Sequence, residues 1–191
     1  LDLALFYYDL LDALGLESAH VVGHSLGGLV AAEMAALDRR YVRKLVLVDA
    51  LGFWRDDVPV LDFFAAPPDE LADALFHDKE SPGAQRAQAL PSAREELAEA
   101  LIGRMQALAA AGKFIWPIPD KGLKRRIHRI QAPTLIVWGA SDGVVPPVYA
   151  EEFRSRIPGS RVVILDRSGH LPMAEQPEEF AAVVTAFLQE E

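Results

Sequence analysis

The hydrophobic pattern of the chain alternates between short continuous apolar runs and longer stretches with helical spacing. Four apolar runs predict buried strands at residues 20–23, 44–49, 134–139 and 161–166. Apolar positions three or four apart predict helices over residues 1–14, 26–37, 147–157 and 177–190. Strands that are apolar on both faces and alternate with helices indicate an α/β fold, a mostly parallel sheet flanked by helices.

The pattern changes between residues 53 and 120, where the sequence predicts no strand. This stretch holds seven of the 13 prolines, five of the nine phenylalanines and two of the three tryptophans. Helical spacing recurs there at Leu97, Leu101, Met105 and Leu108. We therefore predict a helical insertion at residues 53–120 that separates two parts of one core, residues 1–52 and 121–191.

A serine flanked by glycines lies where the first predicted strand meets its helix. The sequence Gly23-His24-Ser25-Leu26-Gly27 matches the G-x-S-x-G pattern of a nucleophile elbow. A strand that turns directly into a helix strains the residue at the apex, so the positions two residues away on either side must be small. The start of the helix offers unpaired N–H groups to a developing anion. The alternative is that Ser25 is an ordinary helix N-cap.

The other predicted strands also end in polar residues. Asp49 ends the second strand, Asp142 follows the third, and His170 follows the fourth. Because the carboxyl ends of parallel strands meet at one edge of the sheet, we expect these residues to gather near Ser25. Asp142-Gly143 is also an ordinary turn signal, which is the alternative for that residue.

The roles follow from the movement of one proton. A serine hydroxyl becomes a good nucleophile when a base takes its proton, and an imidazole with an ordinary pKa of ~6.5 can do so near neutrality. This chemistry assigns Ser25 as nucleophile and His170 as base. Asp142 would fix the imidazole tautomer and stabilise the imidazolium. The backbone N–H of Leu26 would donate to the oxyanion.

Taken together, the motifs resemble those of the α/β-hydrolase superfamily. The matching stretches are 23–28, 133–139 running on to Asp142 and Val145-Pro146, and Ser168-Gly169-His170 followed by Pro172 and Glu175. They extend over nearly the whole chain outside residues 53–120, which the resemblance implies to be a cap or lid. Because some members carry the acid after the preceding strand, Asp49 is a rival to Asp142.

The remaining histidines and a basic run have less specific interpretations. We expect His24, inside the elbow, to pack or to line the pocket rather than to react. His20, His77 and His128 have no motif around them, so solvent or core positions are expected. The basic run 121–129 predicts a solvated face on the segment that joins insertion and core.

Composition and charge exclude several classes of function. The chain has 191 residues, enough for one domain, and its charge of 19 − 28 = −9 argues against nucleic acid as a partner. The absence of cysteine excludes disulfides, thiol catalysis and Cys-ligated zinc. No apolar run reaches the ~20 residues of a membrane span. The residues from Leu1 onward have no basic n-region, so we do not expect them to be a signal peptide. We expect a cytoplasmic protein without cofactor or metal.

The sequence departs from the family pattern before Leu1. The resemblance implies several strands and a His-Gly-type loop ahead of the first helix, and that loop ordinarily supplies the second oxyanion N–H. Neither is in this sequence. We therefore expect the chain to be the C-terminal part of a larger protein. Residues 20–23 would then form an exposed apolar edge that can pair with another chain.

Three functions are compatible with these observations. The sequence favours a serine hydrolase that cleaves a carboxylic ester or related acyl bond of a small hydrophobic substrate through an acyl-enzyme. The first alternative is carbon–carbon bond hydrolysis of a dienoic ring-cleavage product, for which the arm at residues 116–120 is compatible. The second is a non-catalytic module, which the missing oxyanion loop favours. The aromatic residues of 53–120 suit an acyl pocket and internal packing equally well.

Overall fold

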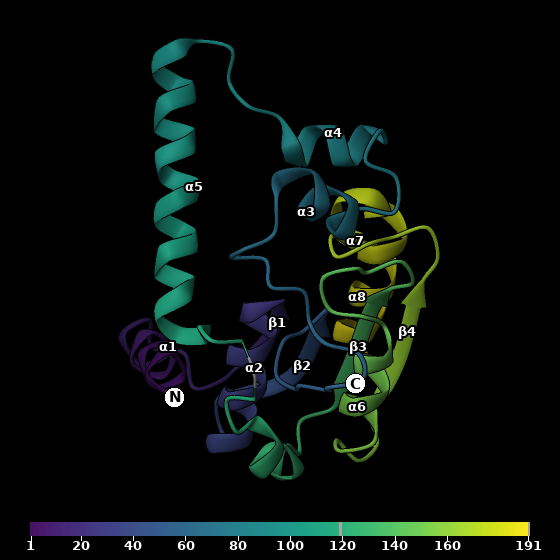
Figure 1. The fold of residues 1–191 in the computed structure, drawn as a ribbon. Helices are drawn as coiled ribbons and strands as arrows, with labels where there is room; N and C mark the ends of the chain where they lie inside the picture. Colours follow the sequence, from purple (N-terminus) through teal and green to yellow (C-terminus); the bar gives the residue numbers. More distant parts are fainter. Residues whose placement is uncertain (119, 191) are drawn as a thin grey trace.

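The fold is built on a four-stranded parallel sheet, seen in a computed structural model that describes residues 1–118 and 120–190 (Figure 1). The strand order follows the chain: β1 (Ala19–His24), β2 (Val42–Val48), β3 (Thr134–Gly139) and β4 (Arg161–Leu165). Each neighbouring pair is parallel, which confirms the predicted fold class. All four carboxyl ends therefore open toward the same edge of the sheet.

Helices cover both faces of this sheet. One face carries α1 (Asp2–Ala13), α2 (Leu26–Leu37) and α6 (Val148–Arg154), whereas α8 (Pro177–Gln189) covers the other, preceded by the short α7 (Pro172–Glu175). Alternate strand residues divide between the two cores: Leu45, Leu47, Ile136 and Trp138 face α2 and α6, and Val46, Val48, Leu135 and Val137 face α8. This explains why β2 is apolar at every position from Leu45 to Val48, and β3 from Leu135 to Trp138.

The N-terminal helix and strand are less buried than their patterns predict. In α1 the buried residues are Ala4 and Tyr8, whereas Phe6 and Tyr7 are exposed. Val22 in β1 is 47% exposed. The exposed edge of β1 agrees with the expectation for residues 20–23, because β1 pairs only with β2 among the described residues. The buried face predicted for α1 is wrong at Phe6 and Tyr7, because the large side chains of α1 lie beside this open strand edge. Small Ala4 instead lets α1 pack closely on α2.

Residues 53–120 contain three helices and, in the described residues, no strand. They are α3 (Pro68–Leu75), α4 (Pro82–Gln88) and α5 (Arg94–Ile115). The helix predicted around residues 97–108 is present as α5, which rises as a column at the side of the molecule (Figure 1). Ile115 is its only buried described residue. Pro119, in the arm singled out by the sequence, lies outside the described residues.

The basic run forms two single turns of 3-10 helix, η1 (Leu123–Arg125) and η2 (Ile127–Arg129). Leu123 and Ile127 are buried, and most of the charged side chains between them are exposed. Arg126 departs from the expected solvated face, because its guanidinium Nε lies 2.8 Å from the buried Glu33 carboxylate of α2. This segment therefore packs on the core and anchors the chain to α2 below α5.

Candidate active site

Ser25 lies at the sharp turn between β1 and α2, in a strained backbone conformation with φ 53° and ψ −118°. The glycines around it explain how the turn fits. A Cβ on Gly23 would lie 2.3 Å from the carbonyl oxygen of Gly27, and one on Gly28 would lie 2.5 Å from Cβ of Ala50. A Cβ on Gly27 would meet no atom within 4 Å. The steric requirement therefore falls on Gly23 and Gly28 rather than on the predicted pair Gly23 and Gly27.

A chain of hydrogen bonds joins the three residues that the strand ends deliver. His170 Nε2 is 2.9 Å from Ser25 Oγ, and His170 Nδ1 is 2.8 Å from Asp142 Oδ2. Because an ionised carboxylate can only accept, we assign the hydrogen to Nδ1. That tautomer leaves Nε2 free to accept the hydrogen of the Ser25 hydroxyl. The side chains of Asp142 and His170 are buried.

Asp142 both shapes its own loop and faces His170. Its Oδ1 accepts from the backbone N–H groups of Val144 and Val145 at 2.8 and 2.9 Å. Its Oδ2 remains for the imidazole of His170. The two interpretations of Asp142-Gly143 from the sequence, a turn and a functional acid, are therefore compatible in one geometry.

Asp49 lies at the end of β2, fully buried and with a left-handed φ of 44°. Its Oδ1 accepts from the backbone N–H of Gly139 at 2.8 Å. Burial, and then the nearby Asp142, raise the pKa of Asp49 well above its usual range. The imidazole Nδ1 of His170 faces Asp142, so the arrangement differs from the alternative in which Asp49 takes the place of the acid.

One group of three side chains could supply metal ligands within the described part of the chain. An oxygen of Asp49, an oxygen of Asp142 and a ring nitrogen of His170 lie within 4.8 Å of one another. However, both oxygens of Asp142 and both ring nitrogens of His170 already take part in the hydrogen bonds described above. The group therefore fits a proton-transfer site better than a metal site.

His24 supports the loop of His170 from inside the elbow. Its Nε2 donates to the carbonyl oxygen of His170 at 2.7 Å, and the two ring centroids are 4.8 Å apart. Burial, together with the neighbouring His170, lowers the pKa of His24 to about 4, which keeps the ring neutral near pH 7. Of the other histidines, His20 and His128 are exposed, and His77 Nδ1 lies 2.8 Å from Ser141 Oγ.

Backbone contacts from α3 hold the loops of both Asp142 and His170. The N–H of His170 donates to Leu75 O at 2.8 Å, and the N–H of Gly143 donates to Ala74 O at 3.0 Å. A Cβ on Gly169 would lie 2.4 Å from Leu75 O, so this approach requires glycine. Gly143 and Gly169 are the only sequence signal for these contacts, and their pattern indicates a turn and a family motif without indicating the contact with α3.

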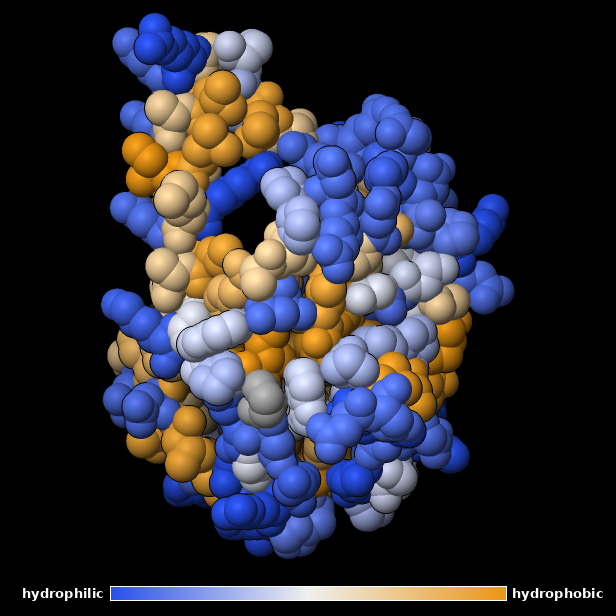
Figure 2. Space-filling view, in the orientation of Figure 1, coloured by the Kyte–Doolittle hydropathy of each residue, from blue (hydrophilic) through white to orange (hydrophobic). Residues whose placement is uncertain are grey.

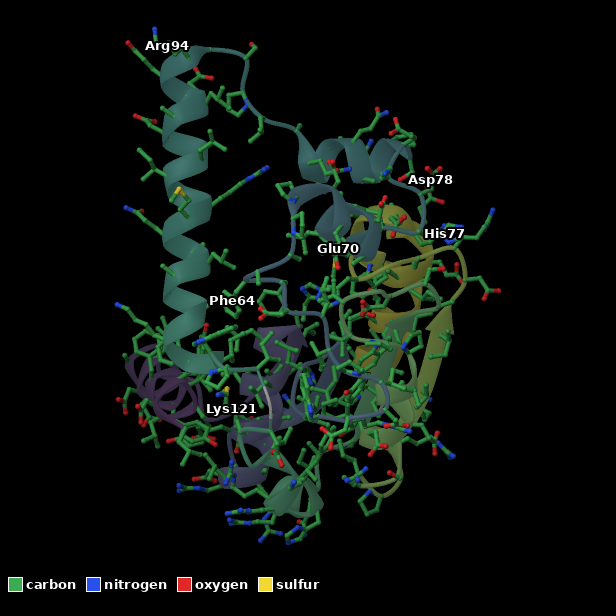
Figure 3. All side chains as sticks on the ribbon, viewed as in Figure 1. Phe64, Glu70, His77, Asp78, Arg94 and Lys121 are labelled. Carbon is green, nitrogen blue, oxygen red and sulfur yellow. The ribbon has the colours of Figure 1, made fainter. Side chains whose placement is uncertain are left out.

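Glu175, noted in the sequence only as a motif position, joins the same two regions. Its carboxylate accepts from Gly169 N at 2.7 Å, and from His77 N and Asp78 N at 3.2 and 3.0 Å. Figure 3 shows His77 and Asp78 on the loop that follows α3, beside α7. The carboxylate therefore bridges the loop of His170 and the chain between α3 and α4.

Leu26 begins α2 directly after Ser25. Its backbone N–H is one of the first-turn groups that have no acceptor within the helix. The position predicted for an oxyanion donor is therefore at the positive end of α2.

Comparison with known proteins agrees with this geometry. A family model described as "Alpha/beta hydrolase family" matches residues 2–183. The chain is 31% identical to an uncharacterized protein of Mycobacterium tuberculosis, covering 94% of this chain and 58% of that protein. It is 32% identical to a pimeloyl-[acyl-carrier protein] methyl ester esterase of Vibrio cholerae (87% and 68% covered). It is 30% identical to a 2-hydroxy-6-oxononadienedioate/2-hydroxy-6-oxononatrienedioate hydrolase of Pseudomonas putida (94% and 66%).

Among solved structures, a bacterial membrane phospholipase A aligns with a TM-score of 0.70 and 28% identity over 97% of this chain and 61% of that one. The chain thus spans a little under two thirds of several proteins that it matches. None of its described helices has the length and apolar character needed to cross a membrane. The matched residues, the sheet and the strained serine turn lead to one conclusion: the chain belongs to the alpha/beta hydrolase family.

Proposed function

We propose that this chain carries the nucleophile, base and acid of a serine hydrolase that cleaves a carboxylic ester or related acyl bond. The observation that carries the proposal is the continuous hydrogen-bond chain from Ser25 through His170 to Asp142, with Ser25 on a strained turn. A helix N-cap serine would not need the hydrogen bond to a buried imidazole. The esterase of Vibrio cholerae supports the same reaction class.

The geometry supports a two-stage mechanism. Ser25 Oγ attacks the carbonyl carbon while His170 Nε2 takes its proton, and Asp142 stabilises the resulting imidazolium. The N–H of Leu26 donates to the oxyanion. Collapse of the tetrahedral intermediate returns the proton from His170 to the leaving alcohol. Water, activated by His170, then hydrolyses the acyl-enzyme and releases the acid.

The oxyanion hole needs a second donor, and removing one donor typically costs ~10²–10³ in rate. We place that donor in the part of the relatives that this chain does not span. The same part would cover the open edge of β1, where Val22 and the apolar side chains of α1 are exposed. Pairing at this edge with another chain is the alternative way to cover it.

Residues 53–120 would serve as the lid over a hydrophobic acyl pocket. An apolar groove between α5 and the arm before α3 supports this role; it is lined by Phe64, Ala65, Met105, Leu108, Ala109, Gly112, Lys113 and Trp116. Figure 2 shows hydrophobic side chains on α5 facing an opening between this helix and the α3–α4 region. Phe64 lies beside the lower half of α5 (Figure 3). We further propose that the substrate is a small hydrophobic ester or acyl compound and that the protein is cytoplasmic.

A second candidate is the hydrolysis of a carbon–carbon bond in a dienoic ring-cleavage product. The similarity to the Pseudomonas putida hydrolase favours it, because that protein is 30% identical over 94% of this chain. Both reactions would use the same three side chains, so the hydrogen-bond geometry does not separate them. The substrate does.

Turnover of nitrophenyl esters and of a dienoate by the same preparation tests the proposal. We expect ester hydrolysis, and a loss of ~10⁴–10⁶ in turnover on Ser25→Ala. Ser155→Ala, at the exposed end of α6, is the matched control and should keep full activity. Turnover of the dienoate alone would select the second candidate. Turnover that survives Ser25→Ala would contradict both candidates, and no turnover of either substrate by the folded wild-type protein would leave the non-catalytic alternative.

A further inference from the structure

Asp49 is a buried carboxyl group that the mechanism above does not use. It is fully buried at the end of β2, and one of its oxygens lies within 4.8 Å of both an oxygen of Asp142 and a ring nitrogen of His170. Two carboxylates buried this closely repel each other, and burial removes the water that would screen them. One proton shared by the pair removes that repulsion, as in other paired buried carboxyl groups.

The hydrogen bonds of Asp49 indicate where the proton lies. Its Oδ1 accepts from Gly139 N–H at 2.8 Å, whereas its Oδ2 is buried and has no donor within hydrogen-bond distance among the described residues. An ionised oxygen there would lose its hydration without compensation. A protonated Oδ2 is instead a donor, and the neighbouring Asp142 carboxylate is an acceptor.

We propose that Asp49 is a positioning residue whose neutral carboxyl group donates a hydrogen bond from Oδ2 to the Asp142 carboxylate and so holds that carboxylate against His170. The backbone at Asp49 has a left-handed φ of 44°, which is sparsely populated. The hydrogen bond from Asp49 N to Val137 O holds the backbone in this conformation and so fixes where the side chain lies. The influence on catalysis rests on the proposed function, whereas the shared proton is a property of the folded chain.

The ionisation of Asp49 agrees with this geometry. Burial, followed by the charge of Asp142, raises its pKa well above the usual range of a carboxyl group, and the N–H of Gly139 opposes this effect without cancelling it. The charged and titratable groups that face Asp49 are Asp142 and, beyond it, His170. Burial and the charge of Asp142 both favour the neutral form of Asp49.

Infrared spectroscopy of the folded chain at pH 7 tests the shared proton without relying on turnover. Aspartate labelled with ¹³C in the side chain should show the carbonyl stretch of one protonated carboxylic acid, which disappears in Asp49→Asn. Asp38→Asn, at an exposed pair with Arg40, is the matched control and should leave the band unchanged. If the folded wild-type chain shows no such band at pH 7, the proposal is wrong, even if Asp49→Asn fails to fold.

The pattern of ester turnover tests the positioning role. Asp49→Ala should lower kcat by about ten- to hundredfold, because a hydrogen bond to a charged group is lost. Asp49→Asn keeps a donor and should restore most of that rate. The acid limb of the pH–rate profile should move in Asp49→Ala and return toward its wild-type position in Asp49→Asn, a change that loss of packing alone would not produce.

The opposite pattern would assign the acid to Asp49. If Asp49→Asn abolishes turnover while Asp142→Asn retains it, Asp49 is the ionised member of the triad and our proposal is overturned. If the band is present but no variant or wild-type chain turns over an ester, the proposed function fails while the shared proton stands. The two failures are therefore distinguishable.

Discussion

Two parts of the segment between β2 and β3 differ in how they meet the core. The α3–α4 region contacts the catalytic loops through backbone atoms: Leu75 O and Ala74 O accept from His170 N and Gly143 N, and Glu175 bridges the same loop to His77 and Asp78. Helix α5, in contrast, is exposed along most of its 22 residues, with Met105 72% exposed. Figure 1 shows α5 as a separate column beside the α3–α4 region.

One inserted segment therefore has two roles in the structure. The α3–α4 region helps to hold Asp142 and His170 in place, so changes there should affect both folding and activity. The α5 region offers apolar surface without holding any loop, so changes there should spare folding.

Adding a methyl group to one glycine in each region should give the largest difference in unfolding free energy between the two regions. A Cβ at Gly83 in α4 would lie 1.8 Å from Ala174 O in α7, so the backbones must separate, and Gly83→Ala should cost about 4 kcal/mol of unfolding free energy. Gly103 in α5 has no atom within 4 Å of an added Cβ, so Gly103→Ala should gain about 1 kcal/mol of helix propensity. Urea unfolding measures both. Equal effects would contradict the contrast.

Acid should lower the stability of the folded chain through His24, which supports the loop of His170. Burial lowers the pKa of His24 to about 4 in the folded chain, whereas an exposed histidine has a pKa of ~6.5. As the pH falls, the unfolded chain therefore binds the extra proton before the folded chain does. Stability should therefore fall as the pH drops from ~6.5 to ~4, by up to about 3 kcal/mol. His24→Gln removes the titration and keeps a donor for His170 O. If urea unfolding of that variant shows the same pH dependence, His24 is not its source.

Loss of the Glu175 carboxylate should weaken the bridge without unfolding the core. In Glu175→Gln one oxygen remains for three backbone N–H groups, which should cost about 2 kcal/mol locally. Hydrogen exchange at Gly169, His77 and Asp78 should become faster, and ester turnover should fall. Glu178→Gln, at an exposed position in α8, is the control. Unchanged exchange at all three amides would show that the bridge is not needed.

Substitution on α5 should have the smallest effect on stability. Met105→Ser should change the unfolding free energy by less than about 0.5 kcal/mol, because the side chain is mostly exposed. If the groove of α5 binds acyl chains, kcat/KM should fall for long-chain esters and stay the same for acetyl esters. A large loss of stability would mean that α5 packs as tightly as the α3–α4 region.

The sequence predicted the sheet and the family because their signals are local. Parallel strands such as β2 and β3 are covered on both faces, so continuous apolar runs identify them. The orientation of α1 was predicted wrongly, because periodicity does not record whether the neighbouring strand has a partner on both sides. The exposed edge of β1 was expected from the family resemblance and not from the hydrophobic pattern. Helices α3 and α4, of eight and seven residues, are too short for a helical period to repeat.

For the site, the sequence predicted the residues that end strands and missed those that act through the backbone. Ser25, Asp142 and His170 each follow a strand, so topology brings them to one edge of the sheet. The carbonyl groups of Ala74 and Leu75 leave no side-chain signal, and the bridge through Glu175 depends on how α7 folds after His170. The carboxyl proton between Asp49 and Asp142 depends on burial, which the sequence does not give.

Labelling by a fluorophosphonate probe, followed by peptide mass mapping, tests directly whether Ser25 is the nucleophile. The probe reacts with a serine whose hydroxyl is activated by a neighbouring base. We expect covalent modification of Ser25 in the folded chain, and no labelling of Ser25→Ala or of unfolded wild-type protein. The absence of labelling at Ser25 in the folded chain, or labelling at another serine instead, would contradict the assignment of Ser25 as the nucleophile.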